Sequence, residues 1–104
     1  MSETLSKESS ARSGRIRIDD RPKHLATRLE RGEIAVINVA DLDRESAAAL
    51  VAAGPVAVLN AQPSLTGRAA ALGPRLILEA GIVLVDDLGQ DIMSLREGQE
   101  VTVT

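Results

Sequence analysis

The sequence predicts an α/β domain, in which short strands and short helices alternate along the chain. Runs of aliphatic residues, typical of strands covered on both faces, recur between Ala-rich segments that favour helix. The junctions are short and hold Gly, Pro, Asp or Asn, residues that end one element and start the next. We expect a compact domain of short strands packed with two or three helices.

The strands are expected in two kinds of segment. Alternation of polar and apolar residues, the pattern of a half-buried strand, predicts strands over 15–19 and 100–104. The remaining strands are expected where aliphatic residues dominate a short run, at 34–39, 56–60, 76–78 and 82–85.

The first two helices have clear start and stop signals. Asp19 or Asp20 stands where an N-cap would, Pro22 lies just inside the first turn, and Gly32 ends the helix. Asp43 can cap the Ala-rich segment 44–53, which Gly54 and Pro55 terminate. A strand, this helix and the next strand then form a βαβ-like unit, with a right-handed crossover if the strands are parallel neighbours.

The second half of the chain has weaker helix signals. A short helix is expected over the Ala-rich stretch 69–72, before Gly73 and Pro74. One helical turn is expected over 91–95, and Asp86 to Gly89 has the composition of a turn.

The composition excludes several classes of chemistry. The 104 residues include no Phe, Tyr, Trp or Cys and one His, His24. A chain without Cys has no disulfide, no thiol nucleophile and no Cys-ligated metal, and one His leaves no His-rich metal site. Without aromatic rings there is no base-stacking platform, so we expect no nucleic-acid partner. His24 lies among basic residues and is predicted to be a surface residue.

The charge is distributed unevenly along the chain. Residues 1–31 hold eight Lys and Arg against five Asp and Glu, whereas residues 32–104 hold four against ten. Residues 1–14 are rich in Ser and poor in apolar side chains, which predicts a disordered amino-terminal arm without a signal peptide. The arm is either a solvated tail or a contact for an anionic surface.

Residues 15–104 are expected to form a single domain, and the final strand stops in mid-pattern, which suggests a fragment of a longer protein. No run is long and apolar enough to span a membrane.

One loop, 60–68, has the composition of a binding site. It gathers side chains that donate hydrogen bonds just before an expected helix N-terminus, where an anion is favoured. The candidate ligand-binding residues, for a phosphate or an acidic partner, are Asn60, Ser64, Thr66, Gly67 and Arg68. The spacing is neither a Walker loop nor a dinucleotide fingerprint. The alternative is that the hydroxyls cap the helix and Arg68 pairs with a surface acid.

Two carboxylate pairs lie near predicted strand ends, Asp41 with Asp43 and Asp86 with Asp87. Such pairs can serve acid–base chemistry or bind magnesium. Capping by Asp43 and turn formation by Asp86 and Asp87 are the interpretation that we favour. No nucleophile elbow of the Gly-x-Ser-x-Gly type occurs. We therefore expect no catalytic residue, metal or cofactor in this chain.

Several stretches of residues 18–104 resemble the amino-terminal domain of the actinobacterial cytokinetic-ring protein family called SteA. The most specific are Thr66-Gly67-Arg68 with Leu72-Gly73-Pro74, and Gly81-Ile82-Val83-Leu84-Val85-Asp86-Asp87-Leu88-Gly89. The resemblance extends to Gly32-Glu33-Ile34-Ala35-Val36-Ile37-Asn38, Asp41-Leu42-Asp43-Arg44 and Ala57-Val58-Leu59-Asn60-Ala61.

The resemblance implies a non-enzymatic interaction or regulatory domain of a cell-division protein. In that family a thiamin-pyrophosphokinase-like domain and a membrane segment follow. This implies protein partners in the division machinery and a place on the cytoplasmic side of the division septum, and it leaves a homo-oligomer open. The alternative is that the 60–68 loop completes a nucleotide or phosphate site with that downstream domain, so that the full-length protein binds ATP.

The order of elements is also similar to the swivelling β/β/α domain of phosphoenolpyruvate-utilising enzymes. This resemblance implies that the short strands form two small packed sheets with two or three helices. In those enzymes a Thr-Ser-His loop carries the phosphoryl group on its His, and Thr66-Gly67-Arg68 matches it with Arg68 at the His position. Arginine stays protonated and is no nucleophile, so the resemblance implies at most phosphate or acidic-partner binding there.

Overall fold

The computed structural model describes residues 11–67 and 71–103, which form one five-stranded sheet and three α-helices. The elements are β1 (Arg12–Ile18), α2 (Pro22–Ala26), β2 (Ile34–Ile37), α3 (Arg44–Ala53), β3 (Ala57–Asn60), α4 (Gly73–Glu79), β4 (Val83–Val85), the 3-10 helix η1 (Gln90–Ser94) and β5 (Glu100–Val103). The predicted α/β class is confirmed. No helix within the described ranges is long and apolar enough to cross a membrane.

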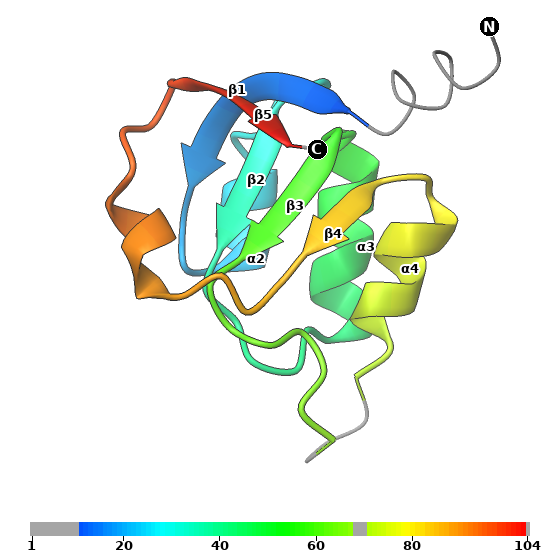
Figure 1. Cartoon of the computed structure of the whole chain (residues 1–104). Helices are drawn as coiled ribbons and strands as arrows, with labels where there is room; N and C mark the ends of the chain where they lie inside the picture. Colours follow the sequence, from blue (N-terminus) through cyan, green and yellow to red (C-terminus); the bar gives the residue numbers. More distant parts are fainter. Residues whose placement is uncertain (1–10, 68–70, 104) are drawn as a thin grey trace, which may run out of the picture.

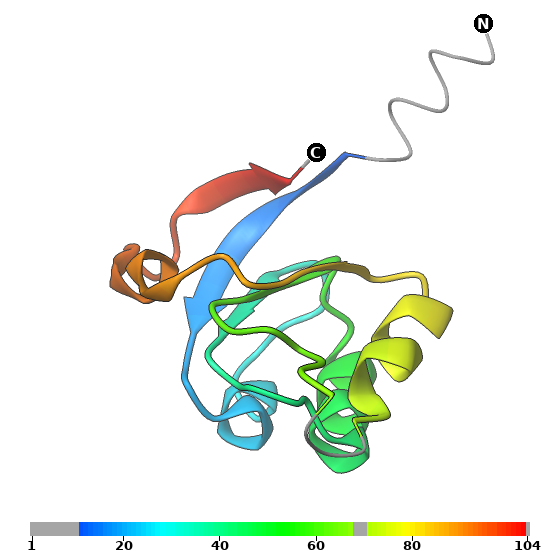
Figure 2. The ribbon, with the colours of Figure 1, turned by 60° about the horizontal axis from the view of Figure 1, so that its bottom comes forward.

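The sheet has the order β4-β3-β2-β1-β5 (Figure 1). Neighbouring strands from β1 to β4 are parallel, and β5 is antiparallel to β1. Each parallel connection passes through one helix and moves one position in the same direction across the sheet. Right-handed crossovers that all progress one way place their helices on one face. Figures 1 and 2 accordingly show α2, α3 and α4 together on that face.

Two apolar clusters lie on the two faces of the sheet. The cluster beneath the helices consists of Leu25, Leu29, Ala35, Ile37, Leu42, Ala47, Leu50, Val58, Ile77 and Ile82. The cluster on the other face consists of Ile16, Ile34, Val36, Ala57 and Leu59, with side chains of η1 and β5 packed against it. All residues of β2 and β3 are buried, as expected for strands covered on both sides.

The sheet curls because β1 is shared between two partners. Its first residues, Arg12 to Arg15, pair with β5, whereas Ile16 to Ile18 pair with β2. Figure 2 shows β5 and the start of β1 on the side of the sheet away from the helices. The strands thus form one curled sheet and not the two small sheets expected. Arg12 to Gly14, placed in the arm by the sequence, are strand residues, and residues 1–10 lie outside the described ranges.

The caps of the two amino-terminal helices differ. Asp43 caps α3 as predicted, since its carboxylate accepts from the Ser46 N–H at 3.4 Å. For α2 the cap position is Arg21, and Asp19 instead accepts from the Arg21 N–H at 3.0 Å. The α2 helix ends at Ala26, well before Gly32.

The strand predicted over 76–78 is wrong, because these residues belong to α4. Ile77 is fully buried while Leu78 is 58% exposed, a helical distribution of burial. A helix was expected over 69–72. Residues 69–70 lie outside the described ranges, and residues 71–72 precede α4. The α4 helix itself has Pro74 in its first turn.

Candidate functional site

The loops that follow the parallel strands meet at one edge of the sheet. In open α/β sheets ligands bind outside the carboxyl ends of the strands. Here polar side chains follow each parallel strand at that edge: Asp19 after β1, Asn38 and Asp41 after β2, Gln62 and Ser64 after β3, and Asp86 after β4. The edge therefore contains the predicted loop and both predicted carboxylate pairs.

Asn60 is fully buried at the end of β3 and makes four hydrogen bonds. Its amide nitrogen donates to the Val39 carbonyl at 2.8 Å and to the Ser64 hydroxyl oxygen at 2.9 Å. Its oxygen accepts from the N–H groups of Val39 at 3.0 Å and Gln62 at 3.1 Å. The Asn60 side chain thus joins the loops after β2 and β3, and its amide nitrogen and oxygen are both used in hydrogen bonds within the protein.

Two further residues of the predicted loop, Ser64 and Thr66, donate hydrogen bonds to two of the predicted carboxylates. Thr66 donates to Asp41 from its N–H at 2.7 Å and from its hydroxyl at 2.6 Å. The N–H of Ser64, a residue only 1% exposed, donates to the Asp86 carboxylate at 2.8 Å. Asp41 and Asp86 come from the two different carboxylate pairs noted in the sequence, and the fold brings one member of each pair to this loop.

This arrangement weakens the case for a phosphate in the loop. An anion beside Ser64 and Thr66 would meet the carboxylates of Asp86 and Asp41, and like charges repel. Gly67 has a φ of +87°, and no neighbouring atom of the described ranges lies within 4 Å of its Cβ position, as a close approach requires. Arg68, the predicted anion donor, lies outside the described residues.

A second polar cluster fixes η1 to the sheet edge. Asn38 and Gln90 exchange two side-chain hydrogen bonds, each of 3.0 Å. Gln62 donates to the Asn38 oxygen at 2.7 Å. No sequence pattern predicted this cluster, because its three amides come from the loops after β2 and β3 and from η1.

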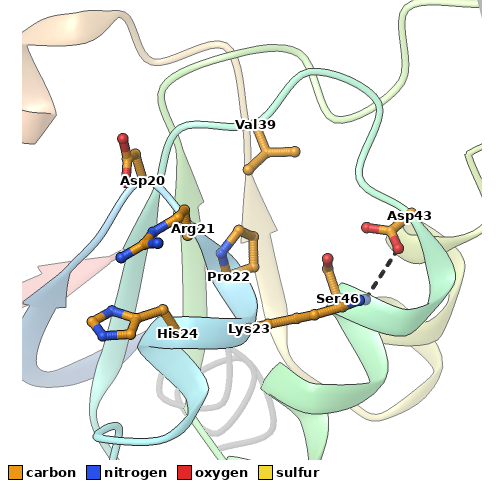
Figure 3. Close-up of a pocket in the computed structure, with 8 residues that line it drawn as sticks. All are labelled: Asp20, Arg21, Pro22, Lys23, His24, Val39, Asp43 and Ser46. Atoms are coloured by element: carbon orange, nitrogen blue, oxygen red, sulfur yellow. Dashed lines mark hydrogen bonds between the residues drawn. The ribbon is translucent and has the colours of Figure 1, made fainter.

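A cavity lies beside this edge, between α2 and the start of α3 (Figure 3). Its volume is about 560 Å³. One wall is the segment 20–24, and Val39, Asp43 and Ser46 form the other (Figure 3). Pro22 and Val39 are its apolar residues, so the cavity can receive a group with an apolar body and a polar end.

The cationic side chains of the cavity have different partners. Lys23 forms an ion pair with Glu45 at 3.2 Å, and both side chains are exposed. The exposed guanidinium of Arg21 forms no ion pair with any residue in 11–67 or 71–103. Arg21 is therefore available to a carboxylate from outside the domain, a group that guanidinium binds in bidentate fashion. Arg21 is not among the residues predicted from the sequence.

The two acids near the cavity are held in their ionised form. Burial would raise the pKa of the Asp19 carboxyl, but hydrogen bonds from His24 and the Arg21 N–H outweigh it and hold the pKa low. A hydrogen bond from the Ser46 side chain is the main cause of the lowered pKa of Asp43. Asp19 and Asp43 thus act here as fixed charges that hold a loop and a helix end.

His24 and Ser46 do not form a nucleophile–base pair. The Nδ1 atom of His24 bonds to Asp19, and no hydrogen bond joins His24 to Ser46 in the part of the chain described. Figure 3 shows the two side chains on opposite sides of Pro22. Such a pair needs nucleophile and base within hydrogen-bond reach, so His24 is not placed to activate Ser46.

In comparisons with known proteins, no family model matches the chain and no curated protein matches it.

Proposed function

We propose that this domain is a non-enzymatic interaction and regulatory domain of a cell-division protein. The sequence resemblance to the SteA family supports the cell-division part of the proposal. The interaction part is supported by how the polar groups of the sheet edge are used. Asn60, Ser64 and Thr66 bond to neighbouring loops and hold them in place, as suits a rigid surface for a partner.

The binding surface is chosen because of one residue, Arg21, which lines the cavity between α2 and α3. It is exposed and has no ion pair among the described residues, and Arg21 lines the same cavity as the apolar residues Pro22 and Val39. A partner protein that presents an acidic side chain next to an apolar one fits this cavity. Arg21 then provides a charge-assisted hydrogen bond, and burial of the apolar side chain adds affinity.

The test is a variant of the full-length protein in its own cells, with Arg21→Ala compared with Arg96→Ala. Arg96 is an exposed arginine away from the cavity and serves as the matched control. We expect Arg21→Ala to reduce enrichment at the division septum in fluorescence microscopy, and Arg96→Ala to leave it unchanged. Equal enrichment of both variants and the wild type would contradict the proposed surface.

The competing function, a phosphate or nucleotide site at the 60–68 loop, is tested by calorimetry. ATP, thiamin phosphates and phosphoenolpyruvate are titrated into the full-length protein and into its Arg68→Ala variant. Under our proposal none of them binds through this loop, because Asp41 and Asp86 face it. Binding that Arg68→Ala abolishes, with the circular dichroism spectrum unchanged, would instead support the nucleotide site.

A further inference from the structure

A second cavity lies between α3 and α4, which pack side by side in Figures 1 and 2. It is lined by Arg44, Leu72, Arg75, Leu76 and Glu79, none of which lines the α2–α3 cavity. Its volume is about 200 Å³. Pockets for small molecules and cofactors usually have about 300–1,000 Å³. The α3–α4 cavity is therefore of a size for a single side chain.

Two leucines form the apolar part of this cavity. Leu76 is half-buried and packs against the apolar cluster beneath the helices. Leu72 directly precedes α4 and is 56% exposed. Single exposed leucines are common, but this one lines a hollow together with a second leucine. An aliphatic side chain seated there would remove apolar surface of both leucines from water, which is favourable.

The position of Arg44 is not explained by the stability of the domain. Arg44 is the first residue of α3, where a cation meets the positive end of the helix dipole. Its side chain is exposed and forms no ion pair with any residue in 11–67 or 71–103. A carboxylate from outside the domain would offset this unfavourable charge and form charge-assisted hydrogen bonds with the guanidinium.

Arg75 brings a second guanidinium to the same cavity. Its Nε donates to the Glu79 carboxylate at 3.1 Å, in a pair whose side chains are both well exposed. Such a surface pair contributes little and does not prevent the arginine from binding a further carboxylate. The lining thus holds two arginines against one glutamate, an excess of one positive charge. This charge is complementary to an acidic ligand.

We propose that the α3–α4 cavity binds a peptide segment of a partner protein in which an aliphatic side chain lies next to an aspartate or glutamate. The aliphatic side chain contacts Leu72 and Leu76, and the carboxylate pairs with Arg44 and Arg75. The occupant is acidic because the lining is cationic, and it is a peptide because the cavity has the size of one side chain. This inference goes beyond the proposed function and does not rest on it, since Arg21 lines the other cavity.

The probe is the blocked dipeptide acetyl-Asp-Leu-amide, whose only charge is the aspartate side chain. It is titrated into the isotopically labelled whole chain and followed by nuclear magnetic resonance. We expect saturable shifts of the amide signals of Arg44 and residues 72–79, with a millimolar dissociation constant. Acetyl-Asn-Leu-amide should bind at least fivefold more weakly, because the charge-assisted hydrogen bonds are lost.

Three results of this titration would overturn the proposal. The first is equal binding of the two dipeptides, and the second is the absence of saturable shifts at these signals. The third is a set of shifts confined to residues 20–24, which would place the dipeptide in the Arg21 cavity instead.

Matched variants then assign the site to Arg44. Arg44→Gln removes the charge and keeps most of the side-chain length, and we expect it to raise the dissociation constant of acetyl-Asp-Leu-amide at least fivefold. Arg21→Gln is the control and should leave the shifts of residues 72–79 unchanged, so that this site and the proposed function are tested separately. An unchanged dissociation constant in an Arg44→Gln variant with the wild-type circular dichroism spectrum would overturn the proposal. Tighter binding of isocaproate than of the dipeptide would overturn it as well, because the cavity would then belong to a free aliphatic acid.

Discussion

Glu97 connects the turn before β5 to the end of β1 and to the segment after α2. Its carboxylate accepts from the Ile18 N–H at 2.9 Å and from both terminal nitrogens of Arg28, at 2.8 and 3.0 Å. The Nη1 atom of Arg17 lies 3.7 Å from the Oε2 atom of Glu97, and the same guanidinium forms an ion pair with Glu33. The hydrogen bonds from Arg28 are the main cause that lowers the pKa of Glu97 to about 2.

This lowered pKa predicts a loss of stability in acid. A carboxylate whose pKa is depressed in the folded state stabilises the protein above its unfolded pKa, and the effect disappears as the pH falls through the folded pKa. For Glu97 the window runs from the ordinary value of 4.5 down to about 2. At neutral pH we expect Glu97→Gln to cost about 1 kcal/mol, since the pair is partly exposed and screened by solvent.

The measurement is urea unfolding followed by circular dichroism at pH 7 and pH 3, because the chain has no Trp or Tyr for fluorescence. The difference between wild type and Glu97→Gln should shrink at the lower pH. Glu100→Gln, which changes an exposed carboxylate on β5, is the control and should have little effect at either pH. A difference that is equal at both pH values would mean that the charge of Glu97 does not stabilise the fold.

Asn60 provides a second prediction at the residue scale. Asn60→Ala removes four hydrogen bonds and leaves the partly buried backbone groups of Val39 and the buried hydroxyl of Ser64 without these partners. We expect a loss of about 2–4 kcal/mol in the free energy of unfolding, since each buried group left unsatisfied costs about 1–3 kcal/mol. Gln90→Ala, at an exposed amide, should cost well under half as much in the same urea titration. A small effect of Asn60→Ala would show that water replaces the lost bonds.

The junction of α4 with the loop before α3 depends on a glycine. A Cβ atom on Gly73 would lie 2.5 Å from the Leu42 carbonyl oxygen and 2.6 Å from that of Asp43. Because both are backbone atoms, they cannot move without shifting the start of α3. We expect Gly73→Ala to cost about 3 kcal/mol, the upper part of the range for overpacking.

Gly81→Ala is the comparison for that variant. Gly81 has a φ of +79° and nothing within 4 Å of its Cβ position, so only the backbone conformation is penalised. We expect about 1 kcal/mol for this change, by thermal unfolding followed by circular dichroism. If the two variants were equally stable, the close contact at Gly73 would not limit the packing of α4.

The elements that the sequence predicted well are those whose signals are local. The β2 run is aliphatic throughout and the β3 run is aliphatic up to Asn60, and Asp43 and Gly54 mark the two ends of α3. The α4 helix was missed because a short apolar run such as Leu76-Ile77-Leu78 fits a buried strand and a helix equally well. The site was predictable only in part. The 60–68 loop was identified, but its partners Asp41 and Asp86 come from loops after β2 and β4, and only the strand order brings them together.

At the scale of the whole molecule, the strand order predicts a gradient of local stability. β2 and β3 have a neighbour on each side and are buried on both faces, whereas β5 is an edge strand joined only to β1 among the described residues. Amide hydrogen exchange should therefore be slowest in β2 and β3 and much faster in β5, because edge elements open in local fluctuations. Protection in β5 equal to that in β2 would mean that the chain opens only as a whole.

The pairing of Arg12 with Val103 sets the mechanical behaviour of the domain. The described chain enters the sheet at the start of β1 and leaves it at the end of β5, and the two strands are antiparallel. A force that pulls these two points apart acts across the ladder, so the hydrogen bonds between β1 and β5 break one after another instead of being sheared together. Under tension β5 would peel away first while the four parallel strands stay paired, so the domain would lengthen in a first, low-force step without losing its core.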